Sequence, residues 1–389
     1  MIEEYSIDSF TSVITGGTPS TSKEEYWNDG NIPWLNSGEL QQDIITKSSN
    51  FITDLGLKNS SSKLMPKDSI LIALTGTTTG KVGYLTFEAC ANQSVTGILP
   101  SNKHIAKHLY YYLYSIRSKV MSDAYGGAQP HISQAYVKKI KIPLPPLETQ
   151  KHIAQILDDA AALRDKTRQL IKEYDALAQS IFLDMFGDPV RNDKGWENKT
   201  LKEICNKITD GTHDTPQRLT EGIKFITGKH IRPFKIDYEN SDYVTEEVHQ
   251  EIYRRCNPEF GDILYTNIGV NFGTAAMNIV DYEFSMKNVA LLKYDRKFVN
   301  GRYLESLLNN ENFKDRLKKV FGIGGAQQFL SLSNIKSVNI LIPPITLQNQ
   351  FAEKITLIEQ QKELAKQEIK ESEDLFNCLL QKAFKGQLT

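Results

Sequence analysis

Two stretches of the chain combine regularly spaced apolar residues with a complete absence of proline and glycine. The first runs from Glu148 to Met185, and its apolar residues recur at every third or fourth position. This spacing places them on one face of an amphipathic helix. At ~1.5 Å per residue the helix would be about 55 Å long, longer than most helices of compact domains. Pro145-Pro146 precedes the stretch and Gly187-Asp188-Pro189 follows it, which sets its limits.

The second stretch runs from Thr346 to Phe384 and has the same apolar periodicity. Residues in and before the two stretches match at one constant offset: Gly127-Ala128-Gln129 with Gly325-Ala326-Gln327, Ser133 with Ser331, Lys138 with Lys336, Pro145-Pro146 with Pro343-Pro344, Gln150 with Gln348, Ala154 with Ala352 and Phe186 with Phe384. The chain is therefore predicted to be a tandem duplication, in which a globular domain of roughly 150 residues precedes one long helix in each copy.

The predicted fold class is α+β, with two similar globular domains. We expect the two long helices to pack antiparallel as a coiled-coil-like spacer that holds the globular parts apart and gives the monomer an internal pseudo-twofold axis. Residues 187–195 are polar and rich in turn formers, and they mark the best domain boundary. The predicted parts are residues 1–147 and 189–345 for the domains, and 148–188 and 346–389 for the helices.

Each domain alternates β-type runs with turn clusters, which favours a curved, mainly antiparallel sheet. The main predicted elements of the first domain are strands at Ile32–Leu35, Ser69–Leu74, Cys90–Leu99 and Ile140–Leu144, and a helix over His104–Met121. Those of the second are a strand at Gly261–Thr266 and a helix over Asn300–Phe321.

Composition narrows the function classes. The net charge is −1 over 389 residues, so the chain lacks the global basic field of many free-standing DNA-binding proteins. Its four cysteines form no C-x-x-C pair, which argues against a structural metal site or a disulfide framework. The polar start MIEEYSIDSF does not resemble a signal peptide, and the apolar runs are too short to span a membrane. We expect a cytoplasmic protein.

Candidate catalytic motifs are incomplete. Gly76–Val82 resembles a phosphate-binding P-loop, but it has three residues between its glycines instead of four and a valine after the lysine. Asn257-Pro258-Glu259-Phe260 lacks the second proline of the loop found in amino-methyltransferases. The seven histidines form no metal-ligand grouping. The sequence thus predicts a chain without catalytic residues, metal site or cofactor of its own.

Polar, glycine-containing loops are the better candidates for function. Glycine lets the backbone approach a ligand closely, while Gln and Asn can read adenine edges, Lys can bind guanine or phosphate, and Thr can contact either. Ordinary surface loops are the alternative for each of them. The candidate DNA-binding residues are Thr18, Thr75, Thr77, Lys81, Gln129 and His131 in the first domain, and Thr212, His213, Thr266, Asn267, Asn271, Gln327 and Gln328 in the second.

Several of these motifs together resemble the specificity subunit of Type I restriction-modification systems. The motifs are Gly16-Gly17-Thr18-Pro19-Ser20 with Tyr26-Trp27 and Ile32-Pro33-Trp34-Leu35, Asp210-Gly211-Thr212-His213, Pro145-Pro146-Leu147-Glu148 with Gln150, and the helix endings Phe186-Gly187-Asp188 and Leu380 to Leu388. The resemblance covers essentially the whole chain. Thr346 departs from it, because an acidic residue is usual at that position.

The resemblance implies a non-catalytic subunit that recognises a bipartite target in double-stranded DNA, one half-site per globular domain. It further implies that the paired helices set the spacer between half-sites and dock two methyltransferase subunits, with a restriction and translocase subunit joining them. S-adenosylmethionine, ATP and magnesium would then lie on those partners, which methylate one adenine per half-site. The residues expected to bind partners are Ile153, Leu163, Leu170, Leu177, Ile355, Ile369 and Phe376.

Two other classes fit parts of the pattern. A coiled-coil adaptor would have the same helices, but its globular domains would bind protein and never DNA. A free-standing methyltransferase would need a glycine-rich cofactor loop upstream of Asn257, and the sequence lacks one. DNA binding in a gel-shift assay would separate the adaptor from the specificity subunit.

Overall fold

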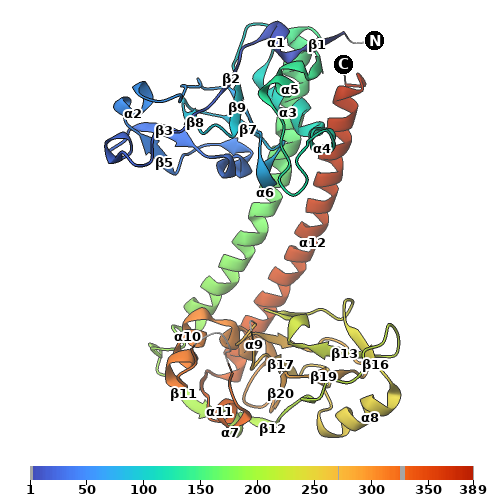
Figure 1. Cartoon of the computed structure of the whole chain (residues 1–389). Coiled ribbons are helices and arrows are strands. Elements are labelled where there is room, and N and C mark those ends of the chain that lie inside the picture. The colour runs from blue at the N-terminus through green and yellow to red at the C-terminus, as the bar shows by residue number, and fades with distance from the viewer. Residues whose placement is uncertain (1–2, 270, 325–328, 389) are drawn as a thin grey trace. The chain divides into compact units, whose positions relative to one another are not determined.

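The computed structural model of the chain describes residues 3–269, 271–324 and 329–388. The chain divides into two compact units. Unit 1 comprises Met1–Gln169 and Lys366–Thr389, and unit 2 comprises Leu170–Ala365. The long helices are α6 (Leu147–Phe186) and α12 (Ile345–Phe384), of 40 residues each (Figure 1). Both predicted helices are confirmed to within one residue at each end. Each unit therefore contains part of both helices.

Unit 1 is built on a five-stranded sheet and a smaller three-stranded sheet. The large sheet has the order β2-β9-β6-β7-β4, and all its neighbours are antiparallel except β4 and β7. The small sheet has the order β5-β3-β8, and β1 pairs with β10. The strands are β1 (Glu4–Ser6), β2 (Val13–Thr15), β3 (Ile32–Leu35), β4 (Ile44–Ile45), β5 (Asn50–Ile52), β6 (Ile70–Ala73), β7 (Val82–Leu85), β8 (Cys90–Ala91), β9 (Val95–Ile98) and β10 (Lys141–Pro143).

The central strand β6 is buried on both faces. Its side chains alternate: Ile70 and Ile72 join a core with the helices, whereas Leu71 and Ala73 join a second core with the small sheet. In Figure 1, α3 (Ala106–Ser115), α5 (Gln134–Lys139) and α6 lie on one side of the large sheet, and the small sheet lies on the other. The remaining short helices are α1 (Ile7–Phe10), α2 (Asp54–Lys58) and α4 (Arg117–Ser122).

Unit 2 repeats this topology. Its main sheet has the order β12-β20-β17-β18, matching β2-β9-β6-β7, and a three-stranded sheet β16-β13-β19 matches β5-β3-β8. The pair β11-β21 matches β1-β10, and β14 pairs with β15. The strands are β11 (Glu197–Thr200), β12 (Cys205–Asp210), β13 (Ile223–Thr227), β14 (Ile231–Arg232), β15 (Lys235–Ile236), β16 (Asp242–Val244), β17 (Ile263–Tyr265), β18 (Ala275–Met277), β19 (Ser285–Lys287), β20 (Ala290–Tyr294) and β21 (Asn339–Ile342). The duplication inferred from the sequence thus extends to the sheets.

Three predicted elements are wrong in detail. The strand expected at Cys90–Leu99 is interrupted by a turn that separates β8 from β9. The helix expected over His104–Met121 breaks at Ile116, where the backbone leaves the α region. The helix expected over Asn300–Phe321 is α9 (Gly301–Asn309) followed by α10 (Glu311–Val320). Asn310 separates them because it is extended and its side chain accepts the Phe313 N–H at 3.1 Å as the N-cap of α10.

The two long helices pack antiparallel within each unit. In unit 1 the start of α6 meets the end of α12, and Ile153, Leu157 and Phe376 share one core. In unit 2 the end of α6 meets the start of α12, where the rings of Phe186 and Phe351 lie 5.1 Å apart. Each unit therefore completes its core with the end of a helix that begins in the other unit. The other helices of unit 2 are α7 (Leu201–Ile204), α8 (Glu246–Arg255) and α11 (Leu332–Lys336).

A repeated glutamine fixes the same joint in both units. Gln150 accepts the Ile105 N–H at 2.9 Å and donates to the Pro145 carbonyl at 2.8 Å. Gln348 accepts the Asn300 N–H at 2.9 Å and donates to the carbonyls of Pro343 and Phe298. Both side chains are buried. Each glutamine thus ties the start of a long helix to the segment that begins α3 or α9.

Candidate nucleic-acid interface

Two predicted loops of unit 1 lie against each other. The Gly76 N–H donates to the Pro130 carbonyl at 3.0 Å, and the Thr79 hydroxyl donates to the same oxygen at 2.7 Å. Thr75 also forms an isolated β-bridge with His131. These bonds join the loop after β6, which carries Thr75, Thr77 and Lys81, to the loop that carries Gln129 and His131. Thr77 and Gln129 are exposed, and the other three residues are half-buried.

A third segment borders this pair of loops. Thr18 donates its hydroxyl proton to Oε1 of Gln93, at 2.5 Å, in the turn between β8 and β9. The Leu74 N–H donates to the Ser94 carbonyl at 2.8 Å and attaches this turn to the end of β6. The structure therefore places Thr75, Thr77, Lys81, Gln129 and His131 on two loops that contact each other, and Thr18 beside a turn that is attached to the end of β6. It also adds Gln93 and Tyr125, which are exposed. A signal for Tyr125 was its place next to Gly126-Gly127.

Close backbone contacts explain why glycine stands at positions 16 and 211. A Cβ on Gly16 would lie 2.2 Å from the Ala91 carbonyl oxygen, and one on Gly211 would lie 2.0 Å from the Met286 carbonyl oxygen. Real Cβ atoms do not approach that closely, so only glycine fits where this loop crosses the end of β8 or β19. The glycines thus place Thr18 and Thr212 beside equivalent edges of the two small sheets.

His213 of unit 2 is held from two sides. Its Nε2 lies 2.9 Å from Oδ2 of Asp210, and its Nδ1 lies 3.0 Å from Oδ1 of Asn288. Asp210 is itself buried and also pairs with Arg255. With both ring nitrogens occupied, His213 can offer DNA its exposed ring face rather than a free hydrogen-bonding nitrogen. Asn288 donates its backbone N–H to Thr212 at 3.2 Å and keeps the two loops in register.

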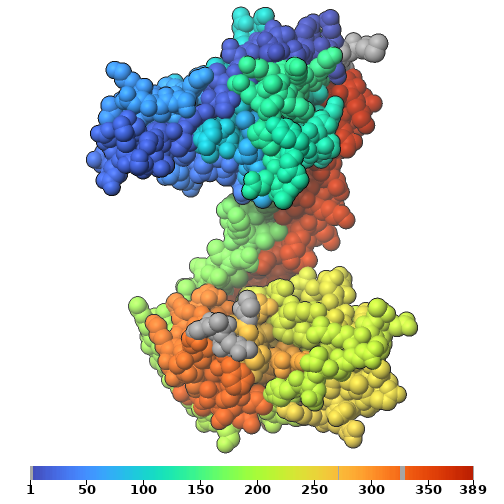
Figure 2. All heavy atoms as spheres, viewed as in Figure 1, coloured from blue at the N-terminus to red at the C-terminus, as the bar shows by residue number. Residues whose placement is uncertain are grey.

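A basic groove lies beside these residues. It has a volume of about 360 Å³, and its residues belong to the part of unit 2 that is coloured yellow-green to yellow in Figure 2. The residues that line it are Arg218, Thr227, Gly228, Lys229, Ile268, Gly269, Asn271, Lys287 and Asn288. Among the described residues this lining contains three cations and no carboxylate, so its local charge is opposite to that of DNA even though the whole chain is close to neutral.

Next to the groove, His230 is buried. Burial lowers the pKa of its ring, and the neighbouring Lys229 lowers it further, while Asp242 and Asp237 act in the opposite direction. Nδ1 of His230 accepts the Thr227 N–H at 2.9 Å, which fixes the turn that carries Lys229. This histidine therefore shapes the groove wall.

Comparison with known proteins decides the family. Residues 2–173 and 193–373 match the family described as the Type I restriction modification DNA specificity domain. The chain belongs to this family. The MjaIX specificity subunit of Methanocaldococcus jannaschii is 27% identical over 370 residues, which are 87% of this chain and 82% of the relative.

Two solved structures share the fold of this specificity subunit. The crystal structure of the Type I restriction-modification S subunit from M. genitalium is 20% identical, with a TM-score of 0.60 over 98% of this chain and 96% of the other. A chain from a structure on complex assembly and conformational transition of the type I R-M system is 16% identical, with a TM-score of 0.59 over 99% and 98%.

Two of the candidate DNA-binding residues in the specificity subunit have structural roles instead. Thr266 and Asn267 are buried, and Asn267 donates its side-chain N–H to the Leu330 carbonyl at 3.1 Å. Asn271 lines the groove but also donates to the Gly228 carbonyl at 3.0 Å. Gln327 and Gln328 lie outside the described residues. We therefore omit Thr266 and Asn267 from the proposed contact surface, because burial and internal hydrogen bonds occupy them.

Sequence reasoning missed Arg218, Lys229, Lys287 and Asn288 of this groove. They come from three separate segments, and no local motif marks them. The only indirect signal was the position of Lys287 and Asn288 just before the β-type run that became β20. Their assembly depends on the pairing of β13 with β16 and β19.

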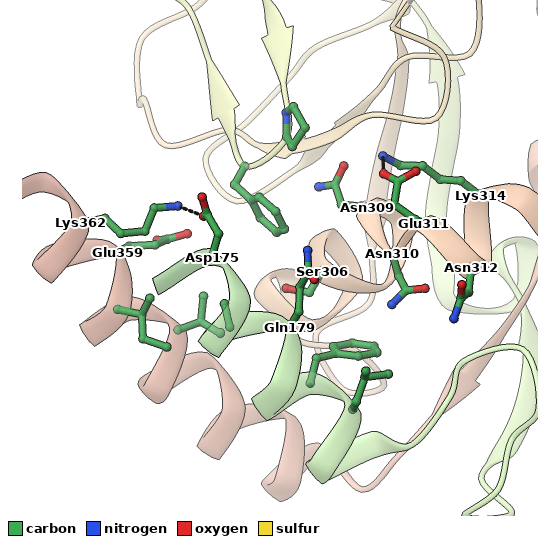
Figure 3. Close-up of a pocket in the computed structure, with 17 residues that line it drawn as sticks. Asp175, Gln179, Ser306, Asn309, Asn310, Glu311, Asn312, Lys314, Glu359 and Lys362 are labelled. Atoms are coloured by element: carbon green, nitrogen blue, oxygen red, sulfur yellow. Dashed lines mark hydrogen bonds and ion pairs between the residues drawn. The ribbon is translucent and has the colours of Figure 1, made fainter. Parts of the chain in front are cut away.

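A larger cavity of about 590 Å³ lies elsewhere in unit 2 (Figure 3). Asp175 and Gln179 reach it from α6, Ser306 and Asn309 from α9, and Lys362 from α12. An ion pair joins Asp175 and Lys362, and the remaining lining mixes polar residues with apolar ones such as Phe182 and Ile355. Side chains from both long helices thus line this cavity, together with Asn310, the residue between α9 and α10.

The expected partner-binding residues divide by exposure. Ile153, Ile355 and Phe376 are buried in the cores, so they stabilise the chain itself and are corrected from docking residues to core residues. Leu170 and Ile369 are half-buried, and Leu163 and Leu177 are exposed. An apolar stripe with regular spacing could not distinguish these classes, because contacts within the chain use the same spacing.

Within residues 3–269, 271–324 and 329–388, no group of three or more His, Cys, Asp or Glu could hold a metal ion. In the same described part of the chain, no helix is both long and apolar enough to cross a membrane.

Proposed function

We propose that this specificity subunit reads a bipartite double-stranded DNA target, with one half-site for each globular part. The parts are residues 1–147 and 189–345. The observation that carries the proposal is that both parts of a duplicated fold place polar loops at equivalent positions after the central strand. In unit 1 these loops carry Thr75, Thr77 and Gln129, and in unit 2 the corresponding region borders a groove with Lys229 and Lys287. The details of the loops differ, so the two half-sites would differ too.

The proposed partners are methyltransferase and restriction subunits. Two methyltransferase subunits would dock on the long helices, residues 148–188 and 346–389, and a restriction and translocase subunit would join them. One of the two similar solved structures was determined to describe assembly of the type I R-M system, which supports such partners. The exposed Leu163 and Leu177 supply apolar contacts that the chain's own cores leave open. S-adenosylmethionine, ATP and magnesium would be bound by the partners, and this chain would be non-catalytic.

The duplication supports an internal pseudo-twofold relation and a spacer role for the helices. Equivalent rings close both cores: Phe384 lies 5.4 Å from His108, and Phe186 lies 4.6 Å from Tyr303. Each helix would extend by ~1.5 Å per residue, so insertion of one helical turn should lengthen the preferred DNA spacer by one to two base pairs, about 5.4 Å. An unchanged spacer length would contradict the proposal that the helices set the distance between the half-sites.

Exchange of the first globular part tests whether each part recognises one half-site. Residues 1–147 are replaced by those of another family member, the chain is co-expressed with its methyltransferase subunits, and methylated adenines are mapped by sequencing. One half of the methylated sequence should change and the other should stay. A change in both halves would refute the assignment of one half-site to each part. Loss of all DNA binding in the unaltered complex would favour the protein-binding adaptor instead.

A further inference from the structure

Two cations of the groove share one carboxylate. Nη1 of Arg218 lies 2.9 Å from Oδ2 of Asp242, and Nζ of Lys229 lies 3.0 Å from the same oxygen. The three residues come from different segments: Arg218 from the loop before β13, Lys229 from the turn after β13, and Asp242 from the start of β16. The Asp242 carboxylate therefore links Arg218, which precedes β13, to Lys229, which follows β13.

The charge at this position is unbalanced. One carboxylate faces two cations, and Lys287 donates to the hydroxyl of Thr215. The lining residues thus keep a net positive charge after Asp242 is counted. The side chains of Arg218 and Lys229 are 44% and 54% exposed, whereas that of Asp242 is 23% exposed. The cations remain accessible to a second anion while the carboxylate stays behind them.

A phosphodiester can compete with this carboxylate. Both are singly charged anions with oxygen acceptors, and Arg and Lys bind either. The cationic side chains are about half exposed and screened by water, whereas Oδ2 of Asp242 is buried, so the carboxylate competes for both cations when a phosphate approaches. Transfer of a cation from Asp242 to a phosphate therefore costs part of the ion pair, and the release of counterions from the DNA offsets this cost.

We propose that the groove holds a DNA backbone phosphate on Arg218 and Lys229, and that Asp242 occupies these cations when DNA is absent. This inference rests on the proposed DNA-binding function and adds a means of regulating it. Because phosphate contacts carry no sequence information, the carboxylate weakens binding to every sequence alike. Base contacts at the correct half-site must then supply the remaining affinity. Asp242 thereby limits capture of the subunit by non-target DNA.

The test uses Asp242→Asn in the full chain, assembled with its methyltransferase subunits. Affinity for a random-sequence 30-base-pair duplex is measured by fluorescence anisotropy over a series of salt concentrations. Asp242→Asn should tighten binding on the order of tenfold near 0.1 M salt, and the slope of log K against log salt should steepen by about one. Lys229→Gln should have the opposite effect, weakening binding and making the slope shallower by about one.

Matched controls separate this site from net charge. Glu197→Gln adds the same charge as Asp242→Asn, and Lys199→Gln removes the same charge as Lys229→Gln. These two residues pair with each other at 2.7 Å and do not line the groove. We expect both controls to change the affinity less than twofold. Thermal melting of each variant verifies folding, and Lys229→Gln keeps the test valid if Asp242→Asn does not fold.

The outcomes are distinct. If the wild-type complex binds duplex DNA but a folded Asp242→Asn complex binds no tighter than Glu197→Gln, the carboxylate does not compete and the inference is wrong. If Lys229→Gln behaves like Lys199→Gln, the groove holds no phosphate and the inference is also wrong. If no complex binds any duplex at low salt, the proposed DNA-reading function itself fails.

Discussion

Replacing Gln348 by alanine tests how firmly a long helix is joined to unit 2. The side chain is buried and accepts the Asn300 N–H, while its own amide donates to the carbonyls of Pro343 and Phe298. Alanine removes all three bonds and leaves one donor and two acceptors without this partner. A buried unpaired group costs ~1–3 kcal/mol, and the deleted side chain also leaves a void. We expect a loss of about 3–5 kcal/mol in the free energy of unfolding of unit 2.

Hydrogen exchange measured by mass spectrometry on the full chain reports this loss for each unit separately. At 1.4 kcal/mol per tenfold, backbone amides of α9 that exchange through unfolding of unit 2 should exchange about one hundred to several thousand times faster. Amides of α3 in unit 1 should be unaffected. Gln150→Ala should show the reverse pattern with a smaller effect, because two hydrogen bonds hold Gln150 where three hold Gln348.

Gln361→Ala is the matched control, since Gln361 lies on the same helix and is exposed. Alanine has high helix propensity, so this change should alter stability by less than about 0.5 kcal/mol. If Gln348→Ala destabilised unit 2 no more than Gln361→Ala, the glutamine joint would contribute nothing measurable. Equal acceleration of exchange in both units would show that they unfold together, and the unit-specific reasoning would fail.

Three further predictions concern other positions. Burial raises the pKa of Glu305 from 4.5 to about 7 despite its 3.0 Å pair with Arg302. The contribution of Glu305 to stability is therefore full below pH 4.5 and falls by on the order of 3 kcal/mol as the pH rises through 7. Urea unfolding across this pH range should show the fall in the wild type and not in Glu305→Gln. Gly211→Ala should destabilise unit 2 by at least about 3 kcal/mol in the same assay, because its Cβ would overlap the Met286 carbonyl oxygen, and an unchanged midpoint would contradict the close approach. Leu163→Lys should leave the melting temperature of the chain unchanged but weaken co-purification with methyltransferase subunits, and undiminished assembly would remove this residue from the docking surface.

Local patterns were sufficient to predict the repeated parts of the fold. The long helices have uninterrupted periodicity between Pro-Pro and Gly-containing ends, and such signals depend little on tertiary context. The breaks at Ile116 and Asn310 were missed because each follows a helical run with no proline or glycine at the break. Asn310 changes the chain direction through its capping side chain, and a capping role becomes clear only when the backbone conformation is known.

The candidate interface was predictable only in part, for a related reason. Glycine-containing loops led to the candidates Thr75, Gln129 and His213, since glycine and polar residues mark turns. The groove cations come from segments whose proximity depends on strand pairing, so Arg218 and Lys229 had no shared sequence signal. The sequence did not distinguish Thr266 and Asn267 from surface residues, because a polar residue at the end of a strand can equally well form hydrogen bonds with buried backbone groups.

The divided roles of the two helix faces explain how a duplicated chain can assemble and still remain able to bind partners. Ile153 and Phe376 complete a core within unit 1, and Phe186 and Phe351 complete one within unit 2. The periodic stripe is therefore largely used inside the chain, whereas Leu163 and Leu177 are exposed. Under the proposed function, variants of the inner positions should lower stability before they affect assembly, whereas variants of the outward positions should affect assembly alone. The sheets and loops of each unit could then vary without altering the helix faces that are proposed to contact partners.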